Sequence, residues 1–209
     1  MITKFTNKEK NIFSCTLRIG FYFILTIGFA YLLRFIASIY QENTFIEFGI
    51  VENLQLSLLV FCAFVFLFQS VLFKQQKALL WFFAALCGFA LIRELDSFFE
   101  KNIPFISWKF CYLLPFIAGL NLIKNRKKLK KNIFSFCSTP AFSLMCTAMF
   151  IFIPVAQIIG NKSFISYTLP TDSDLILIRR FIEESCESIA YFLLLLSGTE
   201  IYFSLKKEK

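Results

Sequence analysis

Long apolar stretches separated by short polar ones dominate this chain. Six stretches have roughly 20 residues or more, the length that crosses a hydrocarbon core of about 30 Å at a helical rise of about 1.5 Å per residue. Because the connections between them are short, neighbouring helices are expected to pack antiparallel. The pattern predicts an all-α bundle of six transmembrane helices in a single domain over residues 1–209. The expected spans are approximately 17–40, 50–73, 78–99, 105–123, 139–160 and 175–203.

The composition agrees with an integral membrane protein. With 57% hydrophobic residues and a mean hydropathy of +0.67, the chain is too apolar for a soluble domain. Its 209 residues are too few for more than one compact unit. Histidine is absent, which removes the commonest general base and metal ligand. We therefore expect no metal site, and the sequence indicates no particular cofactor.

Several boundaries have local signals. Thr139 before Pro140 predicts an N-cap followed by proline at the first helical position. The segment 170–174 offers a turn and capping side chains before the last span. Pro115 and Pro154 fall inside the fourth and fifth spans and are expected to kink them.

The distribution of basic residues predicts the orientation. Fifteen Lys and Arg residues fall in the two ends of the chain and in the connections on one side, against three on the other side. Because cytoplasmic connections carry the excess of Lys and Arg, both termini are expected in the cytoplasm. The net charge of +8 is concentrated beside the spans, which argues against a nucleic-acid partner. The run Lys124–Lys131 is interpreted as a loop that faces anionic lipid headgroups, with a specific lipid or a protein partner as the alternative.

Almost all charged residues inside the predicted spans gather at one level. With the alternating directions above, the ten named below lie in the outer half of the membrane, where each charge costs free energy, up to about 2.5 to 3.5 kcal/mol near the bilayer centre. Such a layer indicates a candidate polar site, to which Gln55 also belongs. The charged members are Arg34, Glu52, Arg93, Glu94, Asp96, Arg179, Arg180, Glu183, Glu184 and Glu187.

The charges of the last span share one helical face. At about 100° per residue, the five from Arg179 to Glu187 occupy an arc of about 140°, which Tyr191 extends. A face of this kind is expected to look into the bundle or into a watery cleft. Six carboxylates stand against four Arg side chains in the layer. Complete pairing would therefore leave two acids that are protonated, hydrated or bound to a cation.

Two interpretations of this layer stay open. Arg–carboxylate pairs can clamp helices together or be solvated at helix ends, and acids at a helix start are favoured by the macrodipole. Alternatively, the layer is a functional site, either of a membrane-embedded enzyme that acts on a lipid-linked or envelope substrate, or of a proton- or solute-coupled carrier. A non-catalytic assembly or sensor protein is a third possibility. The sequence does not decide whether the chain is an enzyme.

Three motifs that contain residues of this layer resemble a known pattern. They are Val51-Glu52-Asn53-Leu54-Gln55, then Arg93-Glu94-Leu95-Asp96-Ser97-Phe98-Phe99 with Trp108, and finally Glu183-Glu184 with Glu187. Together they resemble an uncharacterised family of small polytopic bacterial inner-membrane proteins, over about residues 45–203. The resemblance implies a multi-pass protein of the cell inner membrane and implies no activity.

Overall fold

The computed structural model describes residues 7–40, 44, 49–96, 98–99, 108–159 and 175–207. In this part of the chain every regular element is helical, which confirms the all-α prediction. In chain order the helices are α1 (Asn7–Tyr40), α2 (Ile50–Leu72), α3 (Lys77–Glu94), the 3-10 helix η2 (Trp108–Tyr112), α5 (Leu113–Lys124), α6 (Arg126–Cys137), α7 (Pro140–Phe150), the π-helix η3 (Ile151–Val155), α8 (Ala156–Ile159) and α10 (Leu175–Lys207).

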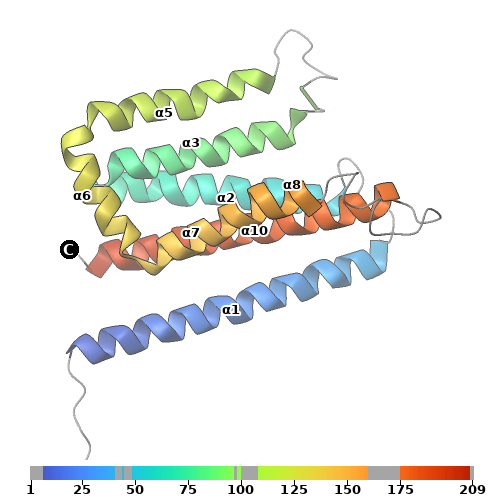
Figure 1. Cartoon of the computed structure of the whole chain (residues 1–209), viewed down its shortest axis with the longest axis horizontal. Coiled ribbons are helices and arrows are strands. Elements are labelled where there is room, and N and C mark those ends of the chain that lie inside the picture. Colours follow the sequence, from blue (N-terminus) through green and yellow to red (C-terminus); the bar gives the residue numbers. More distant parts are fainter. Residues whose placement is uncertain are drawn as a thin grey trace, which may run out of the picture.

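The long helices lie side by side and alternate in direction (Figure 1). α2 and α10 pack on each other; α3 and then α5 follow on one side, while α7 and α1 pack on α10. α1 and α3 end where α2 and α10 begin, and we call this the Glu187 end of the bundle. The opposite end, with the turn between α2 and α3, is called the Lys74 end.

Three described helices are long and apolar enough to cross a membrane: Ile12–Tyr40, Ile50–Leu72 and Leu177–Lys206. A fourth candidate exists if the bent pair Leu129–Cys137 and Pro140–Val155 counts as one span. The helix α3 has 18 residues but carries three charges near its ends, at Lys77, Arg93 and Glu94. The 12 residues of α5 follow the five-residue helix η2. The structure thus supports three or four of the six expected spans by length and composition.

Large apolar side chains cover the outside of the bundle. Phe61 and Phe64 of α2 are 60% and 64% exposed, and Phe116 of α5 and Phe23 of α1 are similarly exposed. Soluble monomers rarely expose apolar surface on this scale. A hydrocarbon environment removes the cost of this exposure, as the sequence composition predicts.

The centre of the bundle depends on small residues where helices meet. A Cβ atom added to Gly198 of α10 would come within 3.1 Å of Val65 in α2. Glycine at this position therefore lets the two backbones approach, and Gln69 of α2 donates to the Gly198 carbonyl at 2.8 Å. Ser197 donates to the carbonyl of Ala141 in α7 at 2.8 Å. Both hydrogen bonds tie α10 to its neighbours inside an otherwise apolar core.

The two prolines act differently from each other. Pro154 lies in the π-helical turn Ile151–Val155. The fifth predicted span, which consists of α7, η3 and α8, is therefore interrupted where the proline has no N–H to donate. Pro115 lies in the first turn of α5, where a missing N–H costs little, and it marks the start of an α-helix instead of kinking one. The predicted boundary at Thr139 and Pro140 is confirmed, although the Thr139 side chain does not cap the helix. The segment 170–174 lies outside the described residues.

The basic run predicted as a loop is the first half of helix α6. Lys and Arg are good helix formers, no Gly or Pro interrupts residues 126–137, and Leu129, Ile133 and Phe136 recur at helical spacing. α6 crosses the Lys74 end of the bundle between α5 and α7 and meets α7 at a bend of 84° (Figure 1).

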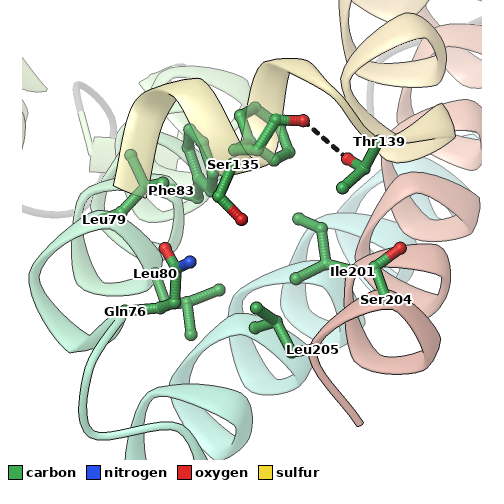
Figure 2. A pocket seen from close by; sticks show the side chains of 10 residues that line it. Gln76, Leu79, Leu80, Phe83, Ser135, Thr139, Ile201, Ser204 and Leu205 are labelled. Carbon is green, nitrogen blue, oxygen red and sulfur yellow. Dashed lines mark hydrogen bonds between the residues drawn. The ribbon is translucent and has the colours of Figure 1, made fainter. Parts of the chain in front are cut away.

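The inner side of α6 covers the Lys74 end. Figure 2 shows Ser135 of α6, Phe83 of α3 and Ile201 of α10 on different sides of a cavity of about 20 Å³. The dashed line is the hydrogen bond in which Thr139 Oγ1 donates to the carbonyl of Phe136 at 2.6 Å. This cavity has room for about one water molecule and for no larger ligand.

A buried ion pair attaches α1 to α10. Glu200 is 1% exposed, and Arg18 reaches its two carboxylate oxygens with Nε and Nη2, both at 2.9 Å. Tyr22 also donates to Glu200 at 2.9 Å. Farther along, Phe29 of α1 stacks on Phe192 of α10 with ring centroids 4.4 Å apart. Arg18 is one of the fifteen basic residues counted above for the orientation, and Glu200 was not among the residues assigned to the polar site, although both fall within a few residues of span ends on the same side.

Removing one partner of this pair is expected to detach α1. Arg18→Met leaves a buried carboxylate without its cation, which costs about 3 to 5 kcal/mol. Adding Glu200→Leu removes that carboxylate as well and should restore most of the loss. Thermal unfolding of the purified protein in a non-ionic detergent measures both variants. A double variant no more stable than Arg18→Met would contradict this account.

Candidate functional site

A polar cluster occupies the Glu187 end between α2, α3 and α10. It consists of Gln55, Arg93, Glu94, Glu184, Glu187, Ser188 and Tyr191, which touch one another through the hydrogen bonds described below. Glu187 and Ser188 lie three and four residues after Glu184, and Tyr191 lies four after Glu187, so the four form one stripe along α10. α2 packs on α10 and brings Gln55 to this stripe, and α3, which packs on α2, brings Arg93 to it.

Gln55 ties α2 to the stripe. Its side chain is fully buried, and its amide nitrogen lies 2.9 Å from Glu184 Oε2, 3.0 Å from the Glu184 carbonyl and 3.2 Å from Ser188 Oγ. The amide oxygen Oε1 is also buried and accepts no hydrogen bond from any described residue. A buried acceptor without a donor costs free energy, so this atom is a place where a ligand or water with an O–H or N–H group would be stabilised.

Arg93 joins α3 to the stripe. Its Nη2 donates to Glu187 Oε1 at 3.2 Å and lies 3.7 Å from Oε1 of its neighbour Glu94. Tyr191 Oη donates to the same Glu94 oxygen at 2.6 Å. Glu187 is 3% exposed, so its charge is compensated inside the bundle and not by water. One Arg thus serves two carboxylates.

The aromatic ring of Phe152 closes one side of this group. The Arg93 guanidinium lies over the Phe152 ring, 5.3 Å from its centroid, and the Phe152 and Tyr191 centroids are 5.4 Å apart. Phe152 belongs to the π-helical turn η3. The irregular turn around Pro154 therefore helps to position the partner of Arg93.

Other members of the predicted layer lie around the cluster. Arg179 pairs with Glu183 at 3.3 Å, within one turn of α10. Glu52 interacts electrostatically with Glu94 and Glu184, so negative charge accumulates on this face. Asp96 follows α3 and interacts electrostatically with Glu94. The sequence placed Arg34 and Arg180 in the polar layer. Both are exposed in the structure and are not buried in the cluster.

An apolar cavity of about 190 Å³ adjoins the cluster. Its walls come from α2, α3, α7, η3 and α10, and Arg93 and Tyr191 are its two polar-tipped residues. The remaining walls are formed by Leu59, Phe83, Leu86, Cys87, Phe89, Ala90, Met145, Ala148, Met149, Phe152, Ile153, Ala190 and Leu194. Ile153 is 58% exposed, so the cavity reaches the outer surface of the bundle.

The cavity is large enough for part of an apolar ligand. A closed apolar cavity of about 150 Å³ can bind benzene, whereas complete drug-sized ligands need about 300 Å³ or more. A cavity of about 190 Å³ therefore fits a segment of a hydrocarbon chain whose remainder lies outside the bundle. The sequence did not predict this cavity, because the volume of the cavity depends on how α3 packs beside the interrupted helix formed by α7 and η3.

The arrangement offers proton-accepting groups beside an apolar wall. Glu94, Glu184 and Glu187 each use one oxygen in the hydrogen bonds above, and the second oxygen of each takes no part in them. No group of three His, Cys, Asp or Glu side chains in the described ranges has the geometry to hold a metal ion. The described cluster offers carboxylates, one guanidinium, a phenol, an amide and a hydroxyl.

Comparison of the chain with protein-family models, curated proteins and solved structures finds no match. The site must consequently be interpreted from its own geometry.

Glu187 and Glu183 provide a matched test of the cluster, because only the first bonds to another helix. Glu187→Ala deprives Arg93 of its closest partner and should destabilise the protein by about 1 to 3 kcal/mol. Glu183→Ala breaks a pair within α10 and should cost about 0.3 to 0.5 kcal/mol. Thermal unfolding in detergent compares the two. Equal losses would show that the Arg93–Glu187 contact does not join α3 to α10.

Proposed function

We propose that this chain is a multi-pass protein of the cell inner membrane with six spans and both termini in the cytoplasm. The alternating directions of α1, α2, α3, α5, α7 and α10 support this arrangement (Figure 1). The excess of Lys and Arg near the Lys74 end supports the orientation, since α6 and the turn between α2 and α3 both lie there. The Glu187 end then lies in the outer half of the membrane. Membership of the family that the motifs resemble belongs to this proposal.

Reporter fusions test the orientation. Green fluorescent protein fused after residue 75 or 131 should fluoresce, because both points are expected in the cytoplasm. Alkaline phosphatase fused after residue 104 or 165 should be active, because both points are expected outside. Active phosphatase after residue 131 would contradict the proposed orientation.

At the polar cluster, we propose that the protein binds a lipid-linked ligand. The supporting observation is the contact between the apolar cavity and the cluster, which share Arg93 and Tyr191. A hydrocarbon chain entering past the exposed Ile153 would bring the polar part of the same molecule to these two residues. Transfer of a chain segment from water into the cavity is favourable by about 0.8 kcal/mol per methylene group, whereas transfer from lipid into the cavity gains little. Affinity and selectivity must therefore come from the polar part.

The cluster favours a polar part that donates hydrogen bonds. Glu187 and Glu94 lie 3.2 and 3.7 Å from Nη2 of Arg93, the guanidinium of the cluster. A phosphate group at Arg93 would therefore meet two negative charges, whereas a hydroxyl or amine can donate hydrogen bonds to the carboxylate oxygens that the bonds described above do not use. We therefore propose a sugar-like or amine-bearing ligand. If the protein is an enzyme, Glu184 and Glu187 are the candidates for proton transfer.

An alkyl glucoside with a photoreactive diazirine in its chain tests this binding site. In the native protein, labelling should concentrate on the residues around Ala90 and Phe152. Ala90→Phe fills the cavity and should reduce this labelling about tenfold, which corresponds to about 1.4 kcal/mol. Ala30→Phe is the matched control, because Ala30 is exposed on α1 and should leave labelling unchanged. Unchanged labelling in Ala90→Phe would refute the site.

A static clamp is the second candidate function, and the closed pairs favour it. Arg93–Glu187 joins α3 to α10, and Arg179–Glu183 is a pair within one turn of α10. If the cluster only holds helices together, Glu187→Gln should lower thermal stability, while the glucoside probe should label Ala90→Phe and native protein alike. If it binds a ligand, Glu187→Gln should also reduce labelling at the cavity.

A further inference from the structure

A second cavity, of about 280 Å³, lies at the Lys74 end. It is enclosed by the turn between α2 and α3, the first residues of α3, the end of α5 and the inner side of α6. The residues that line it are Lys74, Gln75, Lys77, Ala78, Leu79, Asn121, Asn125, Leu129 and Asn132. It is separate from the polar cluster, which occupies the other end of the same helices.

The lining of this cavity is suited to an anion. Lys74 and Lys77 supply two cationic side chains, and Asn121, Asn125 and Asn132 supply amide groups. None of the nine described residues that line it is acidic. Two Lys side chains are typical donors to phosphate oxygens, and the side-chain N–H groups of Asn121 and Asn132 that the bonds described below do not use can add to them.

Hydrogen bonds hold the walls of the cavity in place. Asn132 of α6 donates to the carbonyl of Gln75 at 2.8 Å, which attaches α6 to the turn between α2 and α3. Asn125 donates to the carbonyl and the side-chain oxygen of Asn121 at 2.8 and 3.0 Å, which fixes the corner between α5 and α6. These bonds connect the three walls to each other, and both lysines are exposed.

We infer that this cavity binds the phosphate group of an anionic phospholipid. α6 crosses the end of the bundle, with exposed Lys130 and Lys131 on one side and Ile133 and Phe136 on its apolar side. A helix of this kind lies at the level of lipid headgroups, where basic side chains attract anionic lipids. A phosphate is small compared with about 280 Å³, so the glycerol part of a headgroup also fits.

The proposal that the phosphate belongs to a lipid rests on the proposed orientation in the membrane. Binding of a phosphate group as such does not rest on it. Inorganic phosphate carries the same chemistry without the acyl chains, so it serves as the second probe. The orientation is tested separately by the reporter fusions, and a failure there would leave the phosphate measurement valid.

Two double variants test the site in the full-length protein. Lys74→Gln/Lys77→Gln removes both cations of the cavity. Lys130→Gln/Lys131→Gln removes the same charge from α6, at positions outside the described lining. Thermal unfolding should show that both variants fold like the native protein. Native mass spectrometry in a non-ionic detergent then measures the binding of phosphatidylglycerol and of phosphatidylcholine.

The native protein should bind phosphatidylglycerol more tightly than phosphatidylcholine. Lys74→Gln/Lys77→Gln should weaken binding of phosphatidylglycerol about 25-fold, because each lysine contributes a factor of about five. Lys130→Gln/Lys131→Gln should weaken it less than about threefold. Equal weakening in the two variants, or no preference in the native protein, would overturn the inference. Inorganic phosphate distinguishes the two ligands. If millimolar phosphate displaces the lipid only when Lys74 and Lys77 are present, and if phosphate by itself binds as tightly as phosphatidylglycerol, the phosphate site stands and the lipid as its ligand is overturned.

Discussion

Buried and half-buried carboxylates on α10 impose the strongest constraint on this bundle. Glu187 and Glu200 are buried and Glu184 is half-buried, and each must find a hydrogen-bond donor, because an uncompensated charge inside an apolar bundle is too costly to keep. The donors come from three other helices: Gln55 of α2, Arg93 of α3, and Arg18 with Tyr22 of α1. α10 is therefore the helix that fixes the positions of the helices packed around it. Rotation of α10 by one residue, about 100°, would break all of these contacts together.

Apolar packing alone would specify this arrangement poorly. The chain contains 30 Phe residues, many of which cover the outside, and apolar side chains of similar size can exchange places at a helix interface. In lipid, moreover, apolar surfaces gain little by contact with each other. Specificity consequently comes from the polar pairs and from close contacts such as that at Gly198, which tolerate no shift along the helix.

The level of the polar residues was predictable, but their pairing was not. Helix direction and spacing are encoded locally, so Arg93, Glu187 and Gln55 could be placed at one end of the bundle from the sequence. Which helix lies next to which is a property of the whole chain, and α2 contacts α10 although about 100 residues separate them. Arg34 and Arg180 belong to the same level, yet their helical faces leave them exposed. Arg18 and Glu200 could have been paired from the sequence, because they have opposite charges and lie at equal depth. This signal was missed because Arg18 was counted with the N-terminal lysines.

Features that depend on backbone irregularity were outside the reach of pattern analysis. A proline in a helix predicts an interruption, but not that a π-helical turn would bring Phe152 against Arg93 and Tyr191. The same turn leaves the cavity beside them unfilled, because a regular helix would present different side chains to α3. The basic segment was misassigned for the opposite reason: its charge outweighed the helical spacing of Leu129, Ile133 and Phe136.

The two ends of the bundle differ in the ligands that they can stabilise. At the Glu187 end, carboxylates outnumber the one guanidinium among them and an apolar cavity adjoins it, which favours a molecule with a hydrocarbon chain and donor groups. At the Lys74 end, lysines and amides surround a polar cavity, which favours a phosphate. Both sites involve α3, whose two ends carry Lys77 and Arg93 about 24 Å apart at 1.5 Å per residue. Because α3 packs between α2 and α5 along its whole length, a ligand at either end would stabilise the same helix.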